Sequence, residues 1–178
     1  EAHRTVPESF AGIDLAGLEV RPGARTFRWG GKYLENMNDR ETLFTDLGVL
    51  EDAPPAIPEA FRDSEIVFLA NTHPAVQRGF LEHLPKRRFT VADTMDLWIN
   101  IARDDLTALL GEIDGLVIND SEALLLTEHR NPFTAARAIM EMGPKVVIIK
   151  KGEHGAVLVT PEGVAVIPAF PADEAMVV

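Results

Sequence analysis

The chain has 178 residues, of which 46% are hydrophobic and 25% are charged, an ordinary composition for a globular protein with a substantial core. The formal net charge of -11 argues against a nucleic-acid-binding surface, and the absence of cysteine excludes disulfides and thiolate metal sites. The lack of cysteine also fits a cytoplasmic location, and no apolar stretch approaches the roughly 18 residues that a membrane span needs, so we expect neither nucleic-acid nor membrane partners.

Short extended segments, beginning with Leu18–Val20 and ending near Leu50, are separated by Pro, Gly and Asn residues. This is the pattern of a β-meander, with a Gly-Gly turn at residues 30–31. The meander is too small to bury a core of its own, so we expect it to pack on a larger body or project from it. Residues 1–53 are the first expected unit.

Two side chains of this meander are candidate ligand contacts. Trp29 could stack on a substrate, and Arg28 could meet a phosphate. The alternatives are packing of the meander on a partner meander or on the larger body for Trp29, because Trp suits interfaces equally well, and an exposed strand cation for Arg28.

After Pro54 the pattern changes to alternating strands and helices. Apolar strands are expected at residues 65–70, 88–93, 115–119, 145–150, 155–160 and 163–169. Helices are expected at residues 74–84, 97–109, 121–127 and 134–142. Strands that are apolar throughout and separated by helices indicate an α/β fold, with a mostly parallel sheet that carries helices on both faces. The last two strands should form a hairpin, and residues 54–178 are the second expected unit.

Polar residues follow the expected strands at their carboxyl ends, where ligands of open α/β sheets bind. Asn71 follows the first strand and Asp93 ends the second. Asn71 is either a ligand contact or part of a turn before the next helix. Asp93 is either a substrate contact or the cap of the helix that follows Asp93.

The segment GLVINDSEALLL, residues 115–126, runs from a strand into a helix through Asn119 and Glu122. The spacing is that of a capping box, in which the Asn side chain accepts from a backbone amide of the first helical turn and the Glu side chain accepts from the backbone amide of the Asn. A carboxylate and an amide at a helix start could also face a metal ion and a phosphate. Residues 119–122 alone leave both interpretations open.

The segment KKGEHG places Lys150, Gly152 and Gly155 between two strands. Glycines there would let backbone amides approach a phosphate or base, and the lysine would add positive charge. A simple turn with a lysine at the strand edge explains the same residues. The sequence holds neither a Walker loop nor a dinucleotide fingerprint, and no G-x-S-x-G elbow or histidine zinc spacing occurs.

Taken in order, four segments resemble the ribokinase-like, or PfkB, family of carbohydrate kinases. They are TFRWGGKYLENMNDRETLF, VADTMDLWI, INDSEA and IKKGEHGAVL, although Asp96 stands where the family more often has Asn. The resemblance implies a ribokinase-like fold with a β lid, and because the aromatic meander is too small to be stable alone we expect this lid to form a homodimer contact. The resemblance also implies that Asn119 and Glu122 place Mg²⁺, largely through its waters, against the phosphates of ATP, with Lys150, Gly152 and Gly155 on the nucleotide side.

The activity implied is transfer of the γ-phosphoryl group of ATP to a hydroxyl of a sugar or nucleoside. The family's base is the Asp of a Gly-Ala-Gly-Asp motif, which is absent here. We therefore expect no catalytic base in this chain, a base beyond Val178, missing N-terminal strands, and no activity of the 178 residues alone. The alternatives are a non-catalytic nucleotide-binding or regulatory module, and a doubly wound phosphatase, for which Asp-x-x-Asp is the wrong spacing.

Overall fold

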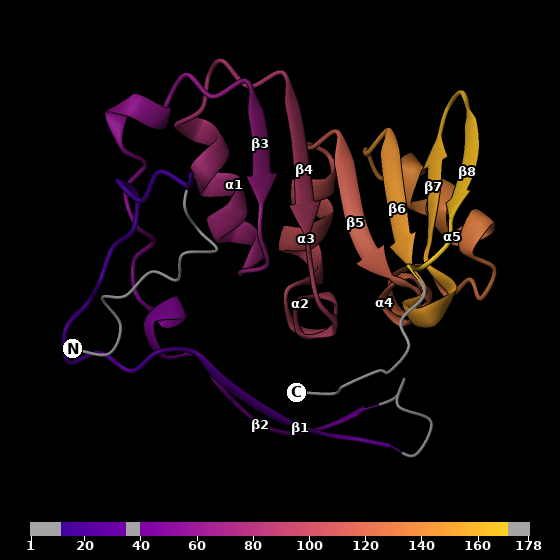
Figure 1. Ribbon diagram of the computed structural model, residues 1–178, viewed down its shortest axis with the longest axis horizontal. Coiled ribbons are helices and arrows are strands. Elements are labelled where there is room, and N and C mark those ends of the chain that lie inside the picture. Colours follow the sequence, from indigo (N-terminus) through magenta and orange to yellow (C-terminus); the bar gives the residue numbers. More distant parts are fainter. Residues whose placement is uncertain (1–11, 35–39, 171–178) are drawn as a thin grey trace.

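The computed structural model describes residues 12–34 and 40–170, with two separate β-sheets. The smaller sheet pairs β1 (Arg28–Tyr33) with β2 (Arg40–Asp46). The larger sheet contains β3 (Ile66–Leu69), β4 (Phe89–Asp93), β5 (Gly115–Asn119), β6 (Val146–Lys150), β7 (Ala156–Thr160) and β8 (Gly163–Ile167). Figure 1 shows the small sheet as a long ribbon that lies beyond the carboxyl ends of β3 to β6.

The large sheet has the strand order β3-β4-β5-β6-β7-β8, which is the chain order. Strands β3 to β6 pair in parallel, whereas β7 and β8 are antiparallel additions. This confirms the mostly parallel sheet and its terminal hairpin. Because parallel strands need crossovers, the helices lie between them in sequence. The helices are α1 (Pro74–Glu82), α2 (Asp96–Ile101), α3 (Arg103–Leu110), α4 (Asp120–Thr127) and α5 (Pro132–Glu141).

One face of the sheet carries the core. Side chains alternate along each strand, so Leu69, Ile118 and Ile149 are buried against the helices, which lie behind the sheet in the view of Figure 1. On the opposite face Ile66 and Phe68 are 77% and 61% exposed. Helices on both faces were expected from the apolar strands, but within the described residues the helices cover only one face.

The ribbon is simpler than the expected meander. Leu18–Val20 is not a strand, and the Gly30–Gly31 pair lies inside β1 at a β-bulge rather than in a turn. The rings of Phe44 and Trp29 lie over these two glycines, where a Cβ would overlap them. The pair therefore gives room to the aromatic side chains instead of reversing the chain.

Proline and side-chain caps mark the starts of two helices. Pro74 opens α1 after His73, whose Nδ1 accepts from the Ala75 amide at 3.2 Å. Pro132 opens α5 after Asn131, whose side chain accepts from the next two amides. Proline suits the first helical position because the amide it lacks has no partner there. No helix in the described residues is long and apolar enough to cross a membrane.

Candidate functional site

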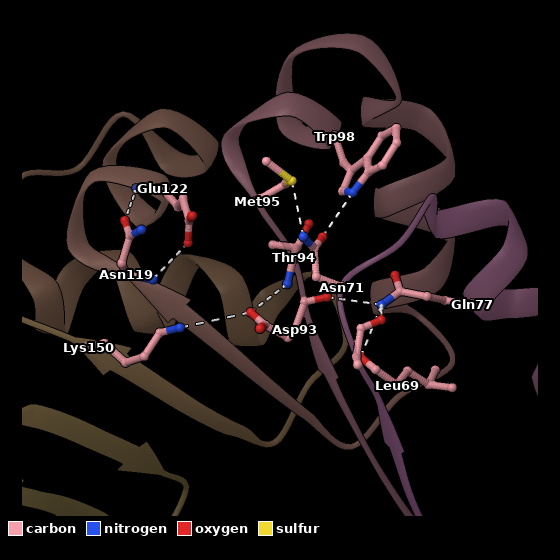
Figure 2. A network of polar contacts seen from close by, with 11 residues as sticks. Leu69, Asn71, Gln77, Asp93, Thr94, Met95, Trp98, Asn119, Glu122 and Lys150 are labelled. Carbon is pink, nitrogen blue, oxygen red and sulfur yellow. Dashed lines mark hydrogen bonds and ion pairs between the residues drawn. The ribbon is translucent and has the colours of Figure 1, made fainter. Parts of the chain in front are cut away.

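Three strand ends and the first turn of α4 bring four charged or polar side chains together, those of Asp93, Asn119, Lys150 and Glu122. Asn119 and Lys150 are the last paired residues of β5 and β6 and lie opposite each other in the ladder, while Asp93 pairs with Val117 on the other side. The Lys150 Nζ atom lies 4.0 Å from Asp93 Oδ1. Figure 2 shows Lys150 reaching toward Asp93, with Asn119 and Glu122 beside them. This juxtaposition is what a parallel sheet imposes, because its strands end at one edge.

Asn119 and Glu122 form the complete capping box. Asn119 Oδ1 accepts from the Glu122 amide at 2.8 Å, and Glu122 Oε2 accepts from the Asn119 amide at 2.9 Å. The cap does not use the Nδ2 atom of Asn119 or the Oε1 atom of Glu122. The two interpretations of this spacing are therefore compatible, since each side chain has one polar atom left for a ligand.

The environment of Glu122 disfavours its negative charge. The side chain is only 6% exposed, and burial raises the pKa of its carboxyl above the ordinary value of 4.5. The hydrogen bond from the Asn119 amide and the charge of Lys150 lower this pKa, whereas Asp93 and Asp96 raise it further. A cation placed at this carboxylate would offset both the burial and the two neighbouring acids.

The turn after Lys150 has a clear backbone reason for its glycines. Gly152 has a φ of 52° and Gly155 a φ of 81°, conformations that residues with a side chain rarely adopt. A Cβ at Gly155 would also overlap the carbonyl oxygen of Ile167. The single turn η4 (Gly152–His154) is closed by the Lys151 amide, which donates to the Gly155 carbonyl at 2.7 Å. The turn thus explains the glycines without a nucleotide and leaves a nucleotide role untested.

Asn71 holds neighbouring side chains. Its Oδ1 accepts from the Trp98 indole at 2.9 Å, and its Nδ2 lies 3.1 Å from the Met95 sulfur. The ring of His73 packs edge-on against Trp98, with 5.1 Å between ring centroids. Both ends of the Asn71 amide are thus engaged, so Asn71 joins the end of β3 to α2.

Asp93 does not cap the helix that follows it. The N-cap residue of α2 is Met95, which makes no side-chain cap hydrogen bond, and Asp93 Oδ1 instead accepts from the Thr94 amide at 2.9 Å. The capping interpretation of Asp93 is therefore wrong. Its carboxylate lies at the end of β4 and faces the ammonium group of Lys150.

Arg28 and Trp29 lie on β1 of the small sheet, not on the elements that carry Asp93, Asn119, Glu122 and Lys150. The Arg28 guanidinium lies 5.7 Å from the centre of the Phe44 ring, and the Trp29 indole donates to Thr42 Oγ1 at 3.3 Å. These contacts hold the two strands of the ribbon together. The Trp29 contact lies within its own ribbon and leaves both substrate stacking and packing on a partner or on the larger body untested, whereas Arg28 is an exposed strand cation with an aromatic neighbour.

Sequence reasoning missed Gln77, which is only 1% exposed on the core-facing side of α1. Its Nε2 atom lies 3.0–3.1 Å from the carbonyl oxygens of Leu69, Ala70 and Asp93. The sequence signal for a buried glutamine was its spacing, because Gln77 follows Pro74 by three residues and precedes Leu81 by four, and both of these residues are buried on the same helix face. A glutamine at such a position needs a buried partner.

The residues that could help to hold a metal ion are Glu122 and Asn119. In residues 12–34 and 40–170, no three His, Cys, Asp or Glu side chains are grouped closely enough to hold one. The donors present are hard oxygen ligands of the kind that Mg²⁺ takes, with most of its coordination left to water and phosphate. The donor set therefore fits a magnesium ion that is shared with a phosphate group.

Known proteins resemble this chain in sequence. The profile of the pfkB family of carbohydrate kinases matches residues 30–176. A cytidine kinase from Thermococcus kodakarensis is 28% identical over 163 residues, which are 89% of this chain and 57% of the relative. The chain thus spans little more than half the length of this relative.

Solved structures share the fold at low identity. A putative ribokinase II from E. coli, in complex with ATP and Mg²⁺, has a TM-score of 0.68 and 19% identity, covering 94% of this chain and 58% of that one. A nucleoside kinase from Burkholderia thailandensis, in complex with inosine, has a TM-score of 0.67 and 17% identity, covering 95% and 55%. Together these similarities establish the ribokinase-like fold.

Proposed function

We propose, because the chain belongs to the pfkB family of carbohydrate kinases, that the whole protein transfers the γ-phosphoryl group of ATP to a hydroxyl group of a sugar or nucleoside. The observation that carries the proposal is the placement of Asn119, Glu122 and Lys150 at one edge of the sheet. Phosphoryl transfer depends mainly on alignment of the reacting groups and on neutralisation of the phosphate charge. Lys150 supplies a positive charge, and Asn119 and Glu122 supply oxygen ligands for a metal ion.

Asn119 and Glu122 are the residues we assign to the magnesium side of the site. Glu122 offers its free carboxylate oxygen, and the capping box holds that carboxylate in one orientation. When bound, Mg²⁺ would neutralise charge on the phosphates of ATP. The start of α4 also carries the positive end of a helix dipole, which favours a phosphate at the same helix end, although the Ser121 and Glu122 amides already donate to the side chains of Asp120 and Asn119.

Lys150, Gly152 and Gly155 are assigned to the nucleotide side. The ammonium group of Lys150 is half exposed and sits beside Asp93, so an entering phosphate can compete for it. The pair is weak in its present form, because 4.0 Å in partly exposed surroundings gives little net stabilisation. The two glycines of the turn that follows support this assignment, because glycine lets backbone amides approach a phosphate or a base closely.

The phosphoryl acceptor and its base are less constrained. Arg28 and Trp29 on the ribbon are candidate acceptor contacts, and Asp93 is a third at the strand ends. Asn71 is a weaker candidate, since Trp98 and Met95 already engage its amide. We assign no residue of 12–34 or 40–170 as the general base. Relatives named as a cytidine kinase and a nucleoside kinase support a nucleoside as well as a sugar.

The ribbon of β1 and β2 is proposed to form the contact of a homodimer. Leu43 and Phe44 are 62% and 46% exposed on β2, which leaves apolar surface on an element with no core of its own. Aromatic and aliphatic side chains of this kind are typical of interface cores. The cytoplasmic location expected from the lack of cysteine stays a prediction.

The test is an ADP-release assay of the whole protein with ATP, Mg²⁺ and a panel of acceptors. Ribose, fructose, 2-keto-3-deoxygluconate, adenosine, cytidine and inosine cover the sugar and nucleoside classes. Acceptor-dependent ADP release supports the kinase. Binding of ATP without turnover on any acceptor would favour the second candidate, a regulatory module that binds nucleotide. Absence of ATP binding would refute both.

A further inference from the structure

The carboxyl ends of β3 and β4 are joined by a side chain rather than by the sheet. Their backbone register ends at Leu69 and Ala92. Ala70 and Asp93, the next residues along the two strands, turn their carbonyl oxygens to the amide of Gln77, each at 3.0 Å from its Nε2 atom. The same nitrogen lies 3.1 Å from the Leu69 carbonyl oxygen. Gln77 thus continues the link between the strands for one residue past the ladder.

The chemistry fixes the orientation of this amide. With two hydrogens for three carbonyl acceptors, Nε2 must face the strand ends, because the reverse orientation would set Oε1 against three oxygens. The Oε1 atom of Gln77 is itself buried without a partner among the described residues. An apolar residue of similar length would avoid that unpaired acceptor, but it would leave the three carbonyl oxygens without the donor that Nε2 supplies. The glutamine is therefore explained by the carbonyl groups that it holds at the two strand ends.

The link leads directly to the candidate site. Gln77 holds the carbonyl group of Asp93, and the carboxylate of the same residue accepts from the Thr94 amide at 2.9 Å and faces Lys150 at 4.0 Å. Figure 2 shows this path from α1 through Asp93 to β6. Because the carbonyl and carboxylate of Asp93 are tied on opposite sides, a shift of its backbone would move the group that faces Lys150.

We propose that Gln77 is a positioning residue, whose buried amide ties the ends of β3 and β4 and thereby sets the position of Asp93 relative to Lys150. Gln77 does not touch a ligand in this scheme. Its effect on phosphoryl transfer rests on the function proposed above, whereas the tie itself is a property of the fold that can be measured without activity.

The matched pair of variants is Gln77→Met and Leu81→Val in the whole protein. Both residues are 1% exposed and lie one turn apart on the same face of α1. Methionine keeps the length of the side chain and removes the amide, whereas Leu81→Val removes a methylene from the same core without touching a carbonyl. A loss of general stability should therefore appear in both variants, and a loss of the tie in only one.

Amide hydrogen exchange measures the tie. In Gln77→Met we expect exchange to accelerate by about tenfold or more in peptides that cover residues 70–73 and 93–97, with residues 115–119 unchanged, because local opening raises exchange only where contacts are lost. In Leu81→Val the two peptides should behave as in the wild type. Equal exchange in Gln77→Met and Leu81→Val would refute the tie.

Steady-state kinetics measure the positioning. We expect kcat of Gln77→Met to fall by about tenfold or more while KM for ATP changes by less than about threefold, because misalignment acts mainly on the transition state. Leu81→Val should keep the wild-type kcat. Faster exchange with unchanged kcat would reduce Gln77 to a structural role and overturn the proposal. A wild-type protein without turnover would refute the proposed kinase, and exchange alone would then decide whether the tie exists.

Discussion

Replacing Glu122 with glutamine separates the two roles open to this residue, because glutamine keeps the cap and removes the charge. The Glu122 oxygen that accepts from the Asn119 amide at 2.9 Å can be replaced by the carbonyl oxygen of a glutamine side chain. That hydrogen bond becomes weaker without the charge, but the variant no longer buries a charge at a site that is 6% exposed. The two effects oppose each other, so we expect the free energy of unfolding to change by at most about 1 kcal/mol at neutral pH.

Activity should change far more than stability. If the free oxygen of Glu122 helps to place Mg²⁺, glutamine removes a charge that acts on the transition state. The loss of one such electrostatic contact lowers kcat by about 10²–10³-fold, or roughly 3–4 kcal/mol of barrier. The Glu122→Gln variant should also need a higher Mg²⁺ concentration than the wild type to reach its maximal rate. Steady-state kinetics over a Mg²⁺ titration, with chemical denaturation of the same samples, measures both quantities.

The pH dependence of stability supplies an independent check. Burial raises the pKa of Glu122 in the folded protein, so its protonated form is favoured by folding. Its contribution to the free energy of unfolding is fully present below the unfolded pKa, near 4.5, and is lost as pH rises through the higher folded pKa. The stability of Glu122→Gln relative to the wild type should therefore increase with pH across this window.

Two results would refute the reasoning. Wild-type kcat and Mg²⁺ dependence in Glu122→Gln would leave Glu122 as a cap alone. A stability difference that falls as pH rises would mean that the carboxylate form is favoured in the fold, contrary to its burial.

Three further predictions follow from other parts of the chain. Lys150→Met should raise KM for ATP by about tenfold in steady-state kinetics because a charged phosphate contact is lost, with Lys150→Arg as the charge-retaining control; an unchanged KM would remove Lys150 from the nucleotide side. Gly155→Ala should lower the free energy of unfolding by more than about 1 kcal/mol in chemical denaturation, because its φ of 81° is strained for alanine and the new Cβ meets the Ile167 carbonyl; a wild-type midpoint would contradict this account. Trp29→Ala should shift the whole protein toward monomer in sedimentation velocity, and a monomeric wild type would refute the lid dimer.

The sequence predicts the large sheet well because its signal is local. Each strand from β3 to β8 is a short apolar run, and each run is separated from the next by a helix or a tight turn. The Asn119–Glu122 capping box is also predictable, since both partners lie within one helical turn. Which face of the sheet is covered does not follow from apolar strands, because Ile66 and Phe68 look like core residues yet stay exposed in the described chain.

Contacts between distant segments account for the remaining errors. Asp93 resembles a cap because it precedes a helix, but its carboxylate accepts from the adjacent Thr94 amide and its carbonyl accepts from Gln77, which lies 16 residues away in sequence. The sequence leaves the role of Asn71 open and cannot show that its side-chain oxygen accepts from the Trp98 indole, in a helix that begins 25 residues later. Gly30 and Gly31 resemble a turn, but neighbouring aromatic rings explain them better. Single-residue patterns cannot specify such partners.

The strands of the large sheet lie side by side in the order in which they occur along the chain. This order bears on how the sheet folds during synthesis. Each strand from β4 to β8 joins the edge made by the strand just before it, so among the strands of residues 40–170 none waits for a later segment to be inserted between existing neighbours. Loop closure is then short at every step, which favours rapid folding. A chain emerging from the ribosome can extend the sheet one strand at a time. Pulse proteolysis of ribosome-bound chains of increasing length should show protection that grows in steps after β5, β6 and β7. Protection that appears only after release of the complete polypeptide would contradict sequential assembly.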